Sequence, residues 1–202
     1  MRPPRRSLKK FPEIMQEVFQ QAGENRPVRL MFEDEARFGR SSEPHRCWAP
    51  KGVRPAVPAQ IVREYEYAYA AVSPHDGVLD TLVLPAVNAE AMGMFLAEVA
   101  RRHADEFLVM VLDGAGWHRA KRLCVPPNMR LVPLPPWSPQ LNPVEHLWDE
   151  VREKWFSNRV FARMSAVEEQ LVTALQTLEE DRPRVASLSG FDWITTVPLN
   201  AH

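Results

Sequence analysis

The chain has 202 residues, of which 45% are hydrophobic and 25% are charged, and its formal net charge is −1. This composition fits one globular domain and excludes a disordered chain, and the two cysteines, Cys47 and Cys124, are too few for a disulfide framework or a cysteine-based zinc site. The sequence has no apolar run near the roughly 20 residues that span a bilayer and no apolar segment behind its basic N-terminus, so we expect a cytoplasmic protein.

Residues 1–27 are predicted to form a basic N-terminal arm or a partial helix, ahead of one folded domain at residues 28–202. The first ten residues carry five basic side chains, at Arg2, Arg5, Arg6, Lys9 and Lys10. Such a cluster can contact phosphate groups, and a solvated tail is an equally good interpretation.

The first half of the domain predicts strands. Residues 28–32 form an apolar run that stops at three acidic residues, Glu33, Asp34 and Glu35, so we expect a strand with carboxylates at its C-terminal end. Residues 41–60 are dense in Pro, Ser and Gly and indicate a loop or a loose hairpin. Two further strands, at residues 61–72 and 78–84, are joined by a turn and form a hairpin.

The second half adds helices and two more strands. Residues 89–103 have apolar side chains at helical spacing, with Asn88 placed to cap the start. Residues 107–112 are continuously apolar, as in a central strand, and Asp113 follows them. The remaining predictions are a strand at 129–134, a helix that Asn142 and Pro143 open, a helix at 165–179, and an irregular or briefly helical end. This order predicts an α/β fold, a mixed central sheet flanked by helices.

Three carboxylates are candidate metal ligands: Asp34, Asp113 and Glu145. The two aspartates follow predicted strands, and strand ends are where an open α/β sheet presents reactive groups. Transfer of a phosphodiester requires an activated attacking oxygen and a stabilised leaving oxygen, which two divalent ions can provide together. Carboxylate oxygens are ligands that Mg²⁺ prefers.

Each of these residues also has a purely structural interpretation. Glu145 could be the glutamate of a capping box, Asp113 a turn residue, and Asp34 part of a solvated acidic loop. His118, five residues after Asp113, could contact the scissile phosphate or orient a metal-bound water, although a lone histidine more often makes a structural hydrogen bond.

Three sequence blocks resemble the catalytic blocks of DDE transposases of the IS630 and Tc1/mariner superfamily. They are Phe-Glu-Asp-Glu-Ala-Arg at 32–37, Val-Leu-Asp-Gly-Ala-Gly-Trp-His at 111–118, and Leu-Pro-Pro-Trp-Ser-Pro-Gln-Leu-Asn-Pro-Val-Glu at 134–145. Weaker similarity at residues 46–52 and 188–194 extends the resemblance over roughly residues 28–194.

The resemblance implies that residues 28–202 form an RNase H-like DDE catalytic domain. Asp34, Asp113 and Glu145 would bind Mg²⁺, with Mn²⁺ as a substitute and two ions expected. The implied activity is metal-dependent cleavage and strand transfer in cut-and-paste transposition, and the implied partners are DNA (transposon ends and target) and a second copy of the chain. Only 33 residues precede Asp34, which is too short for two helix-turn-helix modules, so a separate DNA-binding chain is expected.

Three alternatives stay open at the level of sequence. The same acids could serve an RNase H-like nuclease without strand transfer. Two carboxylates could flank a sugar in a metal-free glycosidase. The chain could also be an inactive or domesticated DNA-binding remnant.

Overall fold

The computed structural model describes residues 17, 26–42, 44–120, 122–135 and 138–196. Its centre is a five-stranded sheet in the order β3-β2-β1-β4-β5. The strands are β1 (Val28–Ser41), β2 (Ile61–Ser73), β3 (Val78–Leu84), β4 (Phe107–Leu112) and β5 (Met129–Pro133). β1, β4 and β5 run parallel, whereas β2 pairs antiparallel with both β1 and β3, so the sheet is mixed as predicted.

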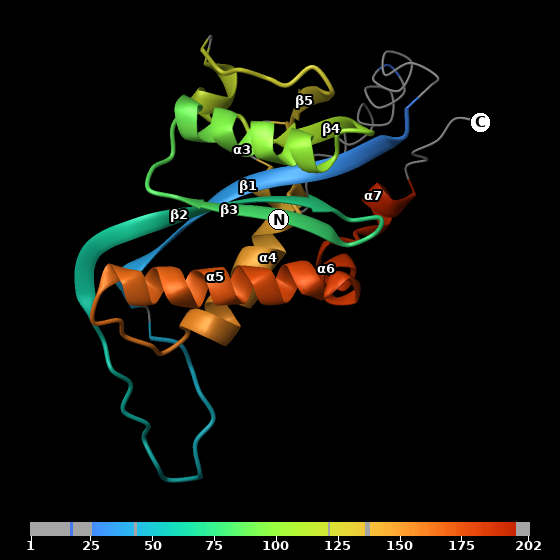
Figure 1. Cartoon of the computed structure of the whole chain (residues 1–202). Helices are drawn as coiled ribbons and strands as arrows, with labels where there is room; N and C mark the ends of the chain where they lie inside the picture. The colour runs from blue at the N-terminus through green and yellow to red at the C-terminus, as the bar shows by residue number, and fades with distance from the viewer. Residues whose placement is uncertain (1–16, 18–25, 43, 121, 136–137, 197–202) are drawn as a thin grey trace.

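Helices cover both faces of the sheet (Figure 1). One face carries α3 (Ala89–Arg102), and the other carries α4 (Val144–Val151) and α5 (Met164–Glu180). A π-helical turn, η3 (Arg152–Phe156), continues α4, and the chain ends in α6 (Arg182–Ser189) and α7 (Asp192–Thr195). The shorter turns are η1 (Gly116–Arg119) and η2 (Pro139–Leu141).

Side-chain alternation along β1 divides the interior into two cores. Leu30 and Phe32 point to the α4 and α5 face, and Met31 points to the α3 face. This alternation follows from the two-residue period of a strand, and it continues through the acidic residues that come next. Neighbouring carboxylates in β1 therefore lie on opposite faces of the sheet.

Most predicted elements are confirmed, including the hairpin, the central strand and the two long helices. Asn88 caps α3 as predicted, because its Oδ1 accepts hydrogen bonds from the N–H groups of Glu90 and Ala91 at 2.9 Å. The predicted irregular or briefly helical end of the chain is helical in α6 and α7.

Two predicted boundaries were wrong. β1 does not end at Phe32 but continues to Ser41, because β2 pairs with it from Val72 back to Ile61. α4 begins at Val144, one residue after Pro143, which the capping-box interpretation of Glu145 places at the first helical position. Pairing with a distant strand decides the first boundary, and local turn geometry decides the second.

Residues 44–60 leave the body of the domain as a long arm between β1 and β2 (Figure 1). Hydrogen bonds between Ser42 and Gln60 close its base, and Trp48 is fully exposed. The predicted basic segment at residues 2–10 and Trp137 of the third sequence block lie outside the described residues. No helix in the part of the chain that the structure describes is both long enough and apolar enough to cross a membrane.

Candidate active site

The register of the sheet brings Asp34 and Asp113 to one level. Phe32 of β1 pairs with Val111 of β4, and the two strands are parallel. Two residues further along each strand lie Asp34 and Asp113, at the point where β4 ends and β1 continues. Neighbouring strands are about 4.8 Å apart, so the two aspartates follow paired positions on adjacent strands. Asp34 thus lies inside a strand and Asp113 just after one, on neighbouring strands as predicted.

Asp34 points toward α4, where Trp148 Nε1 donates a hydrogen bond to its Oδ2 at 3.2 Å. Burial raises the pKa of Asp34 to about 8, and repulsion from Glu145, Glu35 and Asp113 adds to the effect. An isolated surface aspartate would have no such shift. The solvated acidic loop considered for Asp34 is therefore wrong, since the residue is partly buried among other acids.

Glu145 lies in the first turn of α4 and is, after burial, the largest contributor to the raised pKa of Asp34. The capping box considered for Glu145 needs a hydrogen bond from the N–H group of Asn142 to the Glu145 side chain, and the described residues form no such bond. The start of α4 is held instead by Asn142, whose Oδ1 accepts from Val144 N and whose Nδ2 donates to the carbonyl of Glu33. This bond ties α4 directly to β1, beside Asp34.

Asp113 is the most accessible of the three predicted acids, with 55% of its side chain exposed. Its Oδ1 accepts from Ala115 N at 2.8 Å, which is the turn geometry considered for it, and also lies 3.0 Å from His118 Nδ1. The turn and a ligand role are compatible, because a carboxylate has a second oxygen. His118 itself is buried and contacts acids on both sides.

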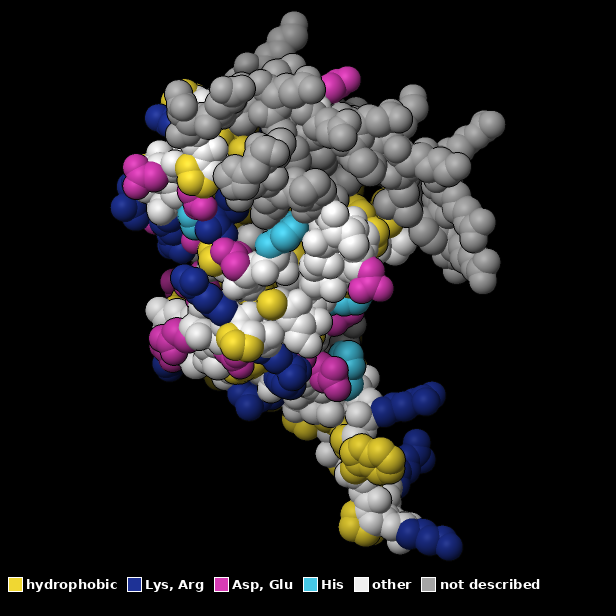
Figure 2. Space-filling view, turned by 90° about the vertical axis from the view of Figure 1, so that its right-hand side faces the viewer, with side chains coloured by type: hydrophobic (Ala, Val, Ile, Leu, Met, Phe, Trp, Pro, Cys, Tyr) yellow, Lys and Arg dark blue, Asp and Glu magenta, His cyan; other side chains and the backbone are white. Residues whose placement is uncertain are grey.

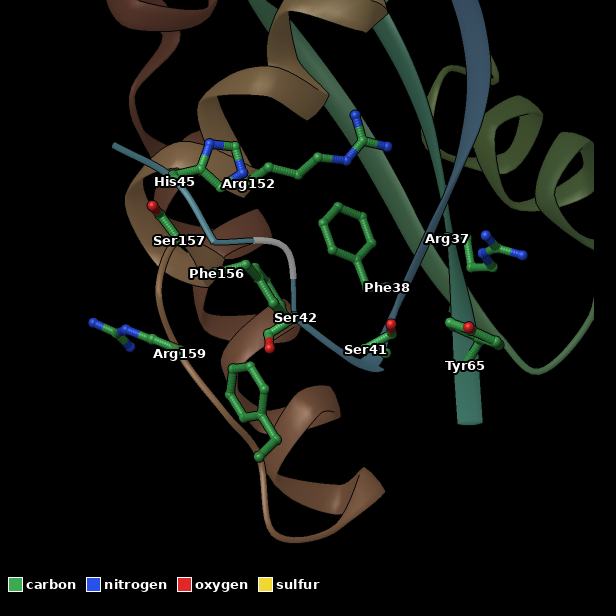
Figure 3. A pocket seen from close by; sticks show the side chains of 12 residues that line it. Arg37, Phe38, Ser41, Ser42, His45, Tyr65, Arg152, Phe156, Ser157 and Arg159 are labelled. Atoms are coloured by element: carbon green, nitrogen blue, oxygen red, sulfur yellow. The ribbon is translucent and has the colours of Figure 1, made fainter. Parts of the chain in front are cut away.

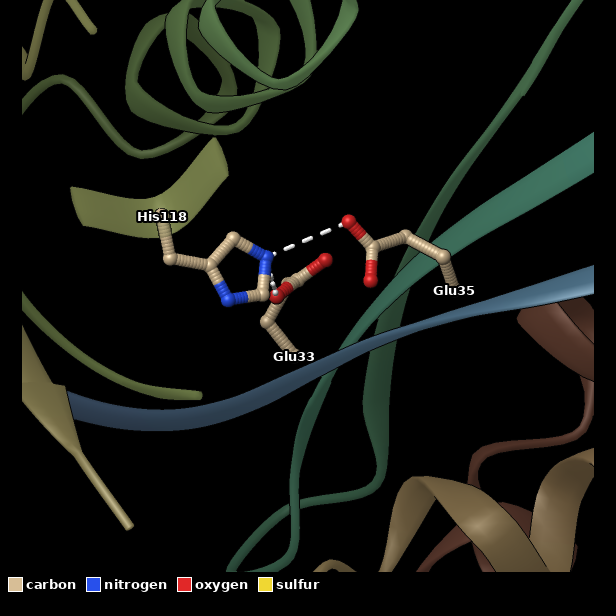
Figure 4. Close-up of side chains that lie close together, drawn as sticks. All are labelled: Glu33, Glu35 and His118. Atoms are coloured by element: carbon tan, nitrogen blue, oxygen red, sulfur yellow. Dashed lines mark hydrogen bonds and ion pairs between the residues drawn. The ribbon is translucent and has the colours of Figure 1, made fainter. Parts of the chain in front are cut away.

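The three acids predicted from sequence are not the tightest group of candidate ligands in the described part of the chain. Glu33, Glu35 and His118 present ligand atoms that all lie within 4.8 Å of one another (Figure 4). Both glutamates project from the α3 face of β1, whereas Asp34 projects from the other face. The sequence did carry a signal for this group, in the two-residue spacing of the glutamates, but it gave no reason to connect them with His118.

A second feature of the surface is a cationic pocket beyond the C-terminal half of β1 (Figure 3). Arg37 stacks on Tyr65, with its guanidinium carbon 4.4 Å from the ring centroid, and Arg152 lies 5.6 Å from the centroid of Phe38. None of the twelve lining residues is acidic, and the basic ones are Arg37, His45, Arg152 and Arg159. A pocket of this charge favours an anionic group such as a phosphate.

Comparisons with known proteins agree with this architecture. A sequence model described as DDE superfamily endonuclease matches residues 29–168. The protein y4pE/y4sA of Sinorhizobium fredii (strain NBRC 101917 / NGR234) is 38% identical over 130 residues, which cover 64% of this chain and 96% of that protein. The Tcb1 transposase of Caenorhabditis briggsae is 34% identical over 77 residues, which cover 35% of this chain and 26% of that one.

Among solved structures, the Mos1 mariner paired-end complex with Mn superposes with a TM-score of 0.56 at 14% identity, over 95% of this chain and 65% of that one. The Mos1 paired-end complex with the left transposon end gives 0.54 at 15% identity, over 94% and 64%. This chain therefore spans slightly less than two thirds of the Mos1 chain.

The mixed five-stranded sheet with helices on both faces is an RNase H-like fold, as the sequence predicted. The chain belongs to the DDE superfamily endonuclease family. The resemblance to DDE enzymes predicted from the sequence is thereby confirmed, with similarity to a Tc1-type transposase over 77 residues, and the glycosidase alternative is set aside.

Proposed function

We propose that this chain is the catalytic domain of a transposase, which cleaves DNA strands and joins them to target DNA with divalent metal ions held by Asp34, Asp113 and Glu145. The observation that carries the proposal is the raised pKa of Asp34. Its carboxyl group is partly buried, three neighbouring acids raise its pKa further, and no basic partner is among the causes of the shift, so the site has an excess of negative charge that a cation would neutralise.

Each of the three residues has a distinct part in this proposal. Asp34 provides a ligand from a rigid central strand, oriented by the hydrogen bond from Trp148. Glu145 provides one from a helix that Asn142 ties to the same strand. Asp113 lies at the exposed end of β4, where a DNA phosphate could approach. Bound divalent ions supply Lewis acidity for the attacking and leaving oxygens, and two ions are the number we propose.

The metal is proposed to be Mg²⁺, with Mn²⁺ able to substitute, because all three ligands offer hard carboxylate oxygens. Asp34 must lose its proton before it can bind an ion. With a pKa near 8, metal binding should therefore release protons at neutral pH and weaken as the pH falls.

DNA is proposed to contact two basic surfaces. One is the pocket of Figure 3, where Arg37 and Arg152 are held against aromatic rings. The other is the arm, whose exposed basic residues are Arg46, Lys51 and Arg54, with basic side chains visible along it in Figure 2. Both surfaces lie on the β1–β2 side of the domain and could follow the phosphate backbone.

Pairing two transposon ends requires two active sites, so we propose that two copies of the chain act together. Recognition of the transposon ends is proposed to depend on a separate helix-turn-helix chain, and residues 1–27 are proposed to be a basic arm ahead of the catalytic domain. Action on cellular DNA, together with two unpaired cysteines, favours the cytoplasm.

The experiment is a nicking and strand-transfer assay on supercoiled DNA and on pre-cleaved oligonucleotides, with Mg²⁺, Mn²⁺ or chelator. Asp113→Asn and Glu145→Gln should each abolish nicking without unfolding the protein, because each exchange preserves size and removes the ligand charge. Glu169→Gln, at a site where 70% of the side chain is exposed, is the matched control and should nick normally.

Retention of nicking in Glu145→Gln would refute the three-carboxylate site. Nicking without joining of pre-cleaved ends, even with a helix-turn-helix partner supplied, would favour the nuclease alternative. Absence of both activities in the wild-type protein would favour the remnant.

A further inference from the structure

A second group of metal-ligand side chains lies on the opposite face of β1 from Asp34. Glu33 and Glu35 extend from this strand toward His118 in η1, as Figure 4 shows. The side chains of the three residues are 0%, 7% and 1% exposed, respectively. This group shares none of its members with the predicted catalytic acids.

Glu33 is the unusual member of the group. It is completely buried, and neither of its carboxylate oxygens has a hydrogen-bond partner among the described residues. Among the described residues, the nitrogen that faces it is His118 Nε2, 3.6 Å from Glu33 Oε2, which is beyond hydrogen-bond distance. A buried carboxylate without a partner is strongly unfavourable unless it is protonated or binds a cation.

The hydrogen bonds of His118 determine which of its ring nitrogens faces the glutamates. Nδ1 lies 3.0 Å from Asp113 Oδ1 and 3.3 Å from the Asp113 carbonyl, and both of these atoms are acceptors. Nδ1 must therefore carry the hydrogen. In the neutral ring, Nε2 then directs its lone pair toward Glu35 Oε1, 3.2 Å away, and toward Glu33. His118 Nε2 and one oxygen each of Glu33 and Glu35 thus direct lone pairs into the same small space. Their mutual repulsion is relieved only if a proton or a metal ion lies between them.

Hydrogen bonds hold His118 and Glu35 in the way that metal ligands are usually held in proteins. An imidazole that binds a metal through one nitrogen usually donates the other N–H to a carboxylate or a carbonyl, as His118 does to Asp113. Glu35 is held in place as well, because Trp117 Nε1 donates to its Oε1 at 2.8 Å.

We propose that Glu33, Glu35 and His118 form a second metal site that takes a divalent transition-metal ion such as Zn²⁺. Two carboxylates and one imidazole suit Zn²⁺ or Mn²⁺ better than Mg²⁺, which rarely takes nitrogen ligands. Ligands about 2.1 Å from one ion are at most about 4.2 Å apart. Since the three ligand atoms already lie within 4.8 Å of one another, shifts of a few tenths of an ångström would suffice.

A metal at this position would also fix the neighbouring Asp113. With Nε2 bound to the ion, His118 can only donate through Nδ1, so the Asp113 carboxylate is held in one orientation. This consequence rests on the proposed function, whereas metal binding by the group does not. The two are therefore tested with different measurements.

The test is a calorimetric Zn²⁺ titration of the whole chain at pH 7 in excess Mg²⁺, with wild type, Glu33→Gln, Glu145→Gln and the control Glu169→Gln. We expect one Zn²⁺ per chain in wild type, Glu145→Gln and Glu169→Gln. In Glu33→Gln the affinity should fall at least tenfold, because a ligand charge is lost while its volume is kept.

Zinc X-ray absorption of the wild-type complex provides evidence that needs no variant to fold, and it should show one imidazole in the ligand shell. Absence of Zn²⁺ binding by the wild type, or a shell of oxygen atoms alone, would overturn the proposal. So would unchanged binding in Glu33→Gln, or binding lost only in Glu145→Gln. Loss of nicking in Glu145→Gln with Zn²⁺ binding retained would leave both proposals standing.

Discussion

Replacement of Asp34 by Asn tests the electrostatic state of the proposed active site. Asparagine keeps the size of the side chain and an oxygen that can accept from Trp148 Nε1, so packing should be preserved. It removes the carboxyl group whose pKa burial and the neighbouring acids raise from 3.8 to about 8. The metal-free variant should therefore be more stable than wild type at neutral pH.

The sign and the size of the effect follow from proton linkage. A carboxyl group with a raised pKa stabilises the folded state fully below its ordinary pKa of 3.8, and this contribution is lost as the pH rises toward 8. Each pH unit in that window corresponds to about 1.36 kcal/mol, so the gain in Asp34→Asn approaches an upper limit of about 4 kcal/mol at pH 7. For a chain of this size, each kcal/mol shifts the melting temperature by about 2–4 °C.

The assay is thermal melting of wild type, Asp34→Asn and the exposed control Glu169→Gln between pH 4 and pH 8, first in chelator and then in Mg²⁺. The advantage of the variant should be near zero at pH 4 and should grow up to pH 8. Magnesium should raise the melting temperature of wild type but not that of Asp34→Asn. A variant that loses stability equally at all pH values would refute the electrostatic reasoning.

Three further predictions concern other parts of the domain. Replacing Arg152 and Arg159 together by Gln should weaken DNA binding in a fluorescence anisotropy titration. The slope of log affinity against log salt concentration should fall by up to about 0.9 per lost phosphate contact, and an unchanged slope would exclude this pocket as a DNA contact. The hydrogen bond to Asp80 raises the pKa of His103 against the effect of burial, so the stability of the fold should fall as the pH rises from about 6.5. His103→Gln should lose this part of the pH dependence in melting experiments, and a melting profile identical to that of wild type would contradict the prediction. Gly77→Ala should destabilise the fold by more than about 1 kcal/mol in urea unfolding, because Gly77 has a φ of +68° and an added Cβ would lie 2.1 Å from a backbone oxygen of α6. An unchanged free energy of unfolding would mean that the turn relaxes freely and would contradict this prediction.

The sequence by itself determined most of the local structure and the three acids of the proposed site. Asn88 predicts the start of α3 because its side chain caps the nearest N–H groups. The run at residues 107–112 predicts β4 because a strand buried on both faces is continuously apolar. These signals are local, so they could be found without knowledge of the fold. Asp34, Asp113 and Glu145 were found through their sequence blocks, because each block places its acid at a fixed distance from recognisable neighbours.

Only the tertiary structure decided features that depend on residues far apart in the chain. β1 continues to Ser41 because β2 pairs with its polar second half. The apolar residues of that half, Ala36 and Phe38, alternate with Phe32 too weakly for the sequence to predict that the strand continues. The fold also sets the pKa of Asp34 and brings His118 to the face of β1 that carries the two glutamates. The physical reason is that strand pairing, burial and Coulombic repulsion act through space, so their effect on a side chain is fixed only when the distant segments have come together.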